Sequence, residues 1–215
     1  MSTLNNYEKT LLRAEQEFLT FDQEEIIRES RLRSDEHYIY VTFFYGDYRI
    51  DRQTGRIEAF LPDGTTRHGT FSEGMGIFDA ICEPTPFRAL SGEMVSVNYF
   101  HSTAFSGQDL YQRYAEGFSE DLPKFRAVCE KIGGKPYGNS DAGYLFEIFD
   151  FLPMALLLWE GEDGIPPAMR FLWDKNATDF IRFETMFYII GHIVDILGEE
   201  MGLNEKQICA ERTNR

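Results

Sequence analysis

The chain has 215 residues, of which 36 are acidic and 21 basic, so its formal net charge is −15. This balance argues against a nucleic-acid-binding face, because neutralising phosphates requires clustered Lys and Arg, and it also disfavours adsorption to anionic lipid. With 43% hydrophobic and 15% aromatic residues, the chain can build a thick core, which argues against disorder over most of its length.

Residues 1–35 are the first predicted element, a helical N-terminal segment. Between about Asn5 and Ser30, apolar residues recur at helical spacing with charges between them, as in an amphipathic helix. Phe21-Asp22 interrupts this run and divides it into two helices. We expect the segment to pack over a sheet.

A three-stranded antiparallel meander is predicted next. The first strand, His37–Tyr45, is dense in β-branched and aromatic residues. Gly46-Asp47 suits a two-residue hairpin turn before the second strand, Tyr48–Asp51. Thr54-Gly55 then separates this strand from the third, Arg56–Phe60.

The middle of the chain carries two patterns that predict helix starts. Thr70 to Glu73 fits a capping box and predicts a helix toward Cys82, although Gly74 and Gly76 weaken it. The second box is Ser106 to Asp109.

Between these boxes, Met94–Phe100 alternates as a strand does. After the second box an apolar helix face extends to Phe118, and Ser119 is expected to cap a further helix. Gly133-Gly134 is expected to end that helix.

The stretch from Leu152 to Asp174 is predicted to be the centre of the fold. Ala155–Trp159 and Ala168–Trp173 are short apolar runs, and Glu160–Pro167 between them can continue neither a helix nor a central strand. Runs of this length, bounded by Gly and Pro, predict two buried strands joined by an acidic loop.

A long helix from about Phe183 to Leu203 is the last ordered element predicted. Its apolar residues follow one another at steps of four and three. Residues 204–215 are polar and are expected to form a disordered tail. Strands and helices are segregated, without a βαβ rhythm. We therefore expect an α+β fold, an antiparallel or mixed sheet covered by helices, as a single domain over residues 1–215.

Cys82, Cys129 and Cys209 form no close pair, which argues against a disulfide framework or a Cys-x-x-Cys motif. The first residues lack the profile of a signal peptide, and no apolar stretch reaches the roughly 18 residues of a membrane span. We expect a cytoplasmic protein.

The order of several motifs resembles a family known as domain of unknown function 3786. The resemblance extends from about Tyr38 to Leu197 and is most specific at the central stretch. The motifs that carry it are Tyr45-Gly46-Asp47-Tyr48, Asp109–Phe118, Gly133-Gly134, Asp141-Ala142 and Leu157–Asp174.

Members of this family occur chiefly in anaerobic bacteria and archaea, and some are joined to or encoded beside iron–sulfur proteins. The resemblance therefore implies an uncharacterised factor of anaerobic metabolism. The loop of the family reads closer to Gly-Asp-Glu-Glu-Phe-Pro, whereas this chain has Gly164 where a second Glu is expected. The chain has no cluster-ligating cysteines, so an iron–sulfur role is not carried over.

The acidic loop supplies four of the five candidate ligand-binding residues. Glu160, Glu162, Asp163 and Asp174 are expected to converge at one end of the hairpin. Carboxylates suit hard cations, and two in different environments can divide acid and base roles. The alternative is a solvated loop that is polar because the strands beneath it are not.

His101 is the fifth candidate, because it lies between a predicted strand and a capped helix, where ligands often bind. His192, Asp195 and Glu199 lie at i, i+3 and i+7, on the predicted face opposite the apolar stripe. This pattern fits a metal site or an oriented general base, and equally a solvent-facing polar stripe.

Signatures of nucleophilic catalysis and of phosphate binding are missing, so no catalytic residue, metal or cofactor is assigned. The aromatic clusters Phe43–Tyr45 and Tyr99-Phe100 suit either a pocket for a flat apolar ligand or the core. Two functions remain. The first is a non-catalytic accessory factor that binds a small molecule or a protein, and the alternative is a metal-assisted hydrolase or lyase that uses residues 160–174. The oligomeric state is left open.

Overall fold

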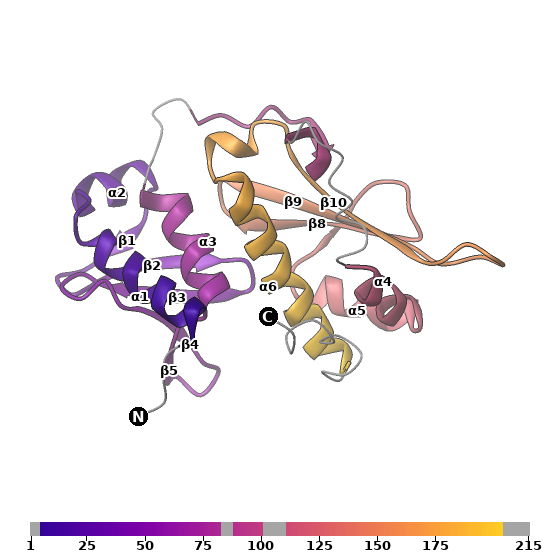
Figure 1. Ribbon diagram of the computed structural model, residues 1–215, viewed down its shortest axis with the longest axis horizontal. Coiled ribbons are helices and arrows are strands. Elements are labelled where there is room, and N and C mark those ends of the chain that lie inside the picture. Colours follow the sequence, from indigo (N-terminus) through magenta and orange to yellow (C-terminus); the bar gives the residue numbers. More distant parts are fainter. Residues whose placement is uncertain (1–4, 83–87, 101–110, 204–215) are drawn as a thin grey trace. The chain divides into compact units, whose positions relative to one another are not determined.

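The computed structural model describes residues 5–82, 88–100 and 111–203. The chain forms two compact units, each built on a five-stranded antiparallel sheet with helices (Figure 1). Unit 1 comprises Met1–Ala89 and Asn176–Gly191, and unit 2 comprises Leu90–Lys175 and His192–Arg215. The predicted α+β class with antiparallel sheet structure is confirmed. The single domain stays a prediction.

The sheet of unit 1 contains the predicted meander with a short strand added at each edge. Its strands, in spatial order, are β1 (Arg33–Ser34), β2 (Tyr38–Phe43), β3 (Gly46–Asp51), β4 (Ile57–Phe60) and β5 (Thr66–His68). Short edge strands leave few unpaired backbone groups for another chain to pair with.

The turn between β2 and β3 differs from the prediction. Phe43 pairs with Gly46, so Phe44 and Tyr45 form the two-residue turn, and Gly46-Asp47 lies in the strand. Phe44 has a φ of 51°, the positive value that glycine was expected to supply. Gly46 is needed for another reason, since a Cβ there would lie 2.9 Å from the Tyr48 ring.

Helices α1 and α3 lie over one face of this sheet (Figure 1). The helices of unit 1 are α1 (Asn6–Phe18), α2 (Gln23–Glu29), α3 (Phe71–Cys82), the 3₁₀ helix η3 (Ala177–Asp179) and the first part of α6 (Phe183–Met201). The two predicted N-terminal helices are therefore confirmed. Asp22 caps α2 by accepting hydrogen bonds from the N–H groups of Glu24 and Glu25.

The capping box of α3 is present, and its two glycines have a packing role. The N–H of Thr70 donates to Glu73 Oε2 at 2.6 Å, and that of Glu73 donates back to Thr70 Oγ1 at 3.4 Å. A Cβ on Gly74 would lie 2.2 Å from Leu11 of α1. The close approach of the two helices therefore outweighs the low helix propensity of glycine.

The sheet of unit 2 has the predicted central hairpin at its core. Its strands, in spatial order, are β6 (Met94–Ser96), β10 (Ala168–Asp174), β9 (Leu152–Trp159), β8 (Ala142–Phe149) and β7 (Lys135–Pro136). Residues of β9 from Met154 to Leu158 are all buried, as predicted. The strand expected over Met94–Phe100 is shorter, because the 3₁₀ helix η1 (Val97–Phe100) replaces its second half.

Two short helices, α4 (Gln112–Ser119) and α5 (Leu122–Lys131), pack on this sheet. Asp121, and not Ser119, caps α5, because its carboxylate accepts the N–H of Lys124 at 3.0 Å. Gly133, with a φ of 88°, follows α5 as predicted. The second predicted capping box lies outside the described residues.

The long C-terminal helix is confirmed as α6. Six of its apolar residues are at most 1% exposed, namely Met186, Ile189, Ile190, Ile193, Val194 and Leu197. Phe183 and Phe187, the first two residues of the predicted stripe, are only partly buried. Within the ranges that the structure describes, no helix has the length and apolar content to cross a membrane. The predicted tail, 204–215, lies outside those ranges.

Candidate functional site: the tip of the β9–β10 hairpin

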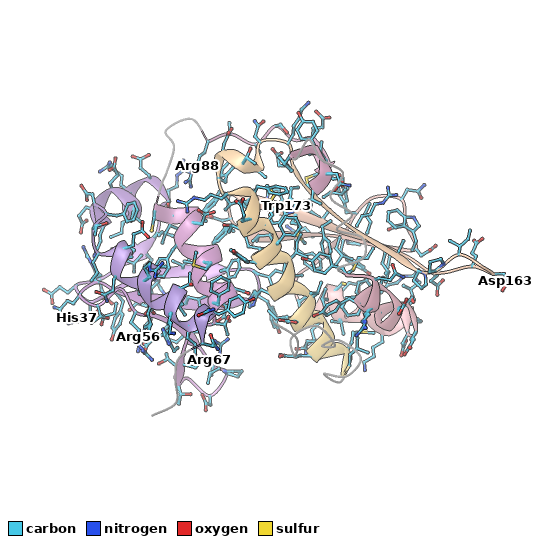
Figure 2. All side chains as sticks on the ribbon, viewed as in Figure 1. His37, Arg56, Arg67, Arg88, Asp163 and Trp173 are labelled. Atoms are coloured by element: carbon cyan, nitrogen blue, oxygen red, sulfur yellow. The ribbon has the colours of Figure 1, made fainter. Side chains whose placement is uncertain are left out.

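The β9–β10 hairpin continues past its strands in an unbroken register. Trp159 pairs with Ala168, and Glu162 and Ile165 form a further antiparallel bridge in the same register. The N–H of Glu162 donates to the carbonyl of Ile165 at 3.0 Å, and the reverse hydrogen bond is 2.8 Å long. Asp163-Gly164 is therefore a two-residue turn, with Gly164 at a φ of 85°. Asp163 lies at the outermost end of this ribbon (Figure 2).

The Asp163-Gly164 pair was the sequence signal for this geometry. Asp-Gly between two apolar runs is among the strongest short-range hairpin signals. The sequence-based prediction was nevertheless only an acidic loop between the two strands, without a defined turn. The two prolines that follow, Pro166 and Pro167, obscured the signal, because proline interrupts a strand pattern.

Gly161 fits the ribbon at a point where no side chain has room. A Cβ there would lie 2.7 Å from the carbonyl oxygen of Ile165 and 2.9 Å from Cδ of Pro167. The backbone of one strand therefore packs directly against the proline pair of the other. Only glycine is accommodated without a shift of one of the two strands.

Two hydrogen bonds and one cation–π contact lie at the base of the tip. Gln112 of α4 donates Nε2 to the carbonyl of Pro167 at 2.9 Å. The N–H of Glu160 donates to Asp141 Oδ2 at 2.8 Å. On the opposite face of the ribbon, the Arg170 guanidinium lies 5.4 Å from the ring centroid of Trp159. The two hydrogen bonds tie the base of the tip to the rest of unit 2.

Every residue from Glu160 to Pro166 is exposed, so the tip is convex and covered on neither face. Ile165 is 64% exposed, the largest exposed fraction among the large hydrophobic residues described. Side chains alternate along a strand, so Glu160 and Glu162 share one face of the ribbon with Ile165. The tip thus combines carboxylates with one apolar side chain in water.

Asp174 does not belong to this tip. It lies at the other end of the seven-residue strand β10, about 20 Å from Ala168 at ~3.4 Å per residue. Its side chain is buried. Oδ1 accepts from the N–H and Oγ of Ser91 at 2.9 and 3.0 Å, and Oδ2 accepts the N–H of Gly92 at 2.8 Å. The expected convergence with the loop carboxylates is wrong, because consecutive strand residues carry Asp174 away from the turn.

Of the two histidines singled out from the sequence, only His192 lies in the part of the chain that the structure describes. His101 lies outside the described residues. His192 is 9% exposed, so the prediction that it faces away from the core is wrong. Asp195 accepts the hydroxyl of Tyr114 at 2.9 Å, a partner 81 positions away that helical spacing could not indicate. Burial and the charge of Asp195 raise the pKa of Tyr111 beside it.

The aromatic clusters are divided between core and surface. Phe43 is fully buried against the Tyr48 ring, with centroids 6.0 Å apart, whereas Tyr45 is 49% and Tyr99 58% exposed. Within residues 5–82, 88–100 and 111–203, no three His, Cys, Asp or Glu side chains form a group that could hold a metal ion.

Comparison with known proteins gives one family. A family model described as Domain of unknown function (DUF3786) matches residues 22–195, a range that contains both sheets and the hairpin tip. No curated protein and no solved structure matches the chain. The resemblance noted in the sequence is confirmed, and the chain belongs to the DUF3786 family.

Proposed function

We propose that this protein is a non-catalytic binding protein, an accessory factor of anaerobic metabolism that presents the β9–β10 tip to a partner protein. The observation that carries the proposal is Ile165, a 64% exposed apolar side chain on a turn that Gly161 and Gln112 hold in place. A pre-organised contact loses less conformational freedom on binding than a flexible loop does.

A protein partner suits this tip better than a small molecule. Small-molecule sites are concave and bury most of their ligand, whereas Glu160 to Pro166 are all exposed on a convex turn. Ile165 supplies an apolar anchor for a pocket on the partner. The surrounding carboxylates of Glu160, Glu162 and Asp163 favour a basic rim around that pocket and raise the association rate.

The metal-assisted hydrolase or lyase is the weaker candidate. Its expected site comprises residues 160–174, and the strand β10 separates Asp174 from the three other acids of that site. The carboxylate of Asp174 is also occupied by Ser91 and Gly92. Divided acid and base roles need carboxylates in different environments that reach one substrate. Glu160, Glu162 and Asp163 are all exposed, and the one buried carboxylate of the four, that of Asp174, is too distant to share a substrate with them.

A photo-crosslinking residue placed at Ile165 in the producing cells tests the proposal. We expect it to capture a defined partner, which is then purified and titrated against the full chain. Ile165→Ser and Asp163→Ala together should weaken the affinity by about ten-fold or more, the effect expected of a central anchor. Leu90→Ser, which alters another exposed apolar residue (45% exposed) in the same unit, is the matched control.

The proposal is rejected if the captured protein binds the Ile165→Ser/Asp163→Ala variant as tightly as the wild type. It is also rejected if the control variant weakens binding equally, because the loss would then reflect general surface hydrophobicity. Thermal melts of all variants establish that each is folded.

A further inference from the structure

One face of the unit 1 sheet is turned away from α1 and α3 and carries a row of Arg and Tyr. The strand registers place one residue from each of four adjacent strands side by side, namely Arg33, Tyr40, Arg49 and Glu58. We call these four residues the Arg33 row. Their strand neighbours, among them Ile39 and Ile50, are buried on the helix-covered face.

Guanidinium groups and aromatic rings interleave on this face. The Arg33 guanidinium lies 4.6 Å from the centroid of the Tyr40 ring, and that of Arg49 lies 4.3 Å from Tyr38 and 5.5 Å from Phe60. Arg and aromatic residues are enriched at the centres of protein interfaces and among residues that dominate binding. This face therefore shares its content of Arg and aromatic residues with the centres of protein interfaces.

The two arginines of the row differ in their ionic partners. Arg49 is paired with Glu58 at 2.7 Å, and this hydrogen bond raises the pKa of the Arg49 guanidinium. Arg33 is exposed and its guanidinium lies over the Tyr40 ring, and within the described part of the chain it has no carboxylate partner. A cation–π contact does not use up the five N–H donors of a guanidinium, which remain able to bind a carboxylate. Arg33 is thus the position at which this face would accept an acidic group.

We propose that the Arg33 row binds the β9–β10 tip of a second copy of this chain. The tip offers Glu160, Glu162 and Asp163 to the Arg33 guanidinium, and it offers Ile165 to the neighbouring rings. The inference rests on the proposed function, since it uses the same tip and names its partner.

The net charge of −15 on each copy does not prevent this contact. Repulsion between exposed charges is largely screened beyond about 8 Å at physiological ionic strength, whereas ion pairs in contact are screened less. The tip and the Arg33 row are different surfaces, so the association is head-to-tail. Such a contact either adds copies in an open series or closes them into a ring. A tip and a sheet face of this size form a small interface, and the association is weak and transient.

Sedimentation velocity of the full chain from about 10 μM to about 1 mM tests this inference in the range expected of weak interfaces. The wild type should gain mass with concentration. Arg33→Glu and the double variant Glu162→Lys/Asp163→Lys should each remain monomeric. An equimolar mixture of the two should associate again, because each supplies the charge that the other has reversed. Arg28→Glu, on the exposed surface of α2, is the control and should behave as the wild type.

A wild type that stays monomeric over this range, or an Arg33→Glu variant that associates as the wild type does, overturns the inference. If Arg33→Glu associates as the wild type does but the tip variant stays monomeric, the tip still binds a partner. The proposed function then stands, and only the assignment of the Arg33 row as its binding surface is wrong. If the crosslinker at Ile165 captures a different protein and the wild type is monomeric, the proposed function likewise stands and the Arg33 row is not the partner surface. If the tip variants affect neither association nor capture, both proposals are wrong.

Discussion

The two ends of the β9–β10 hairpin carry the same chemical group in opposite circumstances. At one end, Asp174 is buried and accepts three hydrogen bonds from Ser91 and Gly92. At the other end, Asp163 stands exposed at the turn. A carboxylate at the buried end of a strand can therefore stabilise the fold through its hydrogen bonds. A carboxylate at the exposed turn is accessible to a partner.

Replacing Asp174 should have the largest effect on stability. Asp174→Ala leaves the N–H groups of Ser91 and Gly92 without their acceptor, which should lower the free energy of unfolding by about 2–3 kcal/mol. Asp163→Ala, at an exposed position, should change it by less than about 0.5 kcal/mol. Urea denaturation of both variants measures the difference. Equal effects would remove the distinction between the two ends.

Gly161→Ala should loosen the tip and leave the buried end of the hairpin unchanged. A Cβ at this position displaces the carbonyl of Ile165 or the ring of Pro167, which should cost about 1–2 kcal/mol locally. We expect the amide hydrogens of Glu162 and Ile165 to exchange about ten-fold faster, as that cost implies. Glu162→Ala keeps the backbone bridge and is the control. Unchanged exchange in Gly161→Ala would mean that the ribbon absorbs the methyl group without loss.

Asp35 extends the comparison to unit 1, because it is a carboxylate that is exposed yet hydrogen-bonded. The hydroxyl of Tyr40, followed by the N–H groups of His37 and Tyr38, lowers the pKa of Asp35 from 3.8 to about 2. A lowered pKa stabilises the fold above pH 3.8, and this contribution is lost as the pH falls toward 2. Acid denaturation of Asp35→Asn should therefore show a shallower decline over that window than the wild type. Superimposable curves would contradict the assignment.

Divalent metals should have the smallest effect. The tip carboxylates are exposed and Asp174 is distant, so Mg²⁺, Mn²⁺ or Zn²⁺ should shift the melting temperature by less than about 1 °C, since stabilisation requires preferential binding to the native state. A larger rise that disappears in Asp163→Ala would bring the metal-assisted enzyme back into consideration.

Sequence patterns predicted the elements that can be identified from the spacing of apolar residues within one segment. The apolar run of β9 and the spacing of three and four along α6 both correspond to the observed elements. The meander was also predicted, although the prediction placed its first turn at Gly46-Asp47, two residues after the observed turn. There, Phe44 adopts a positive φ that propensity assigns to glycine.

Contacts between distant residues could not be predicted in this way. Asp174 follows Trp173 at the end of an apolar run. Its role as a hydrogen-bond acceptor becomes visible only in the fold, because its partner Ser91 lies 83 positions earlier in the sequence. The Arg33 row likewise depends on three strand registers, which no spacing along one strand records. The acids of the tip were recognised from the sequence, whereas their separation from Asp174 required the register of β10.

Amide hydrogen exchange at the tip tests the central claim most directly. The N–H groups of Glu162 and Ile165 bond across the ribbon, so both report on the turn itself. Adding the partner captured at Ile165 should slow the exchange of these two amides and leave that of the β8 amides unchanged. Exchange at the tip that is the same with and without the bound partner, together with protection elsewhere, would contradict the claim.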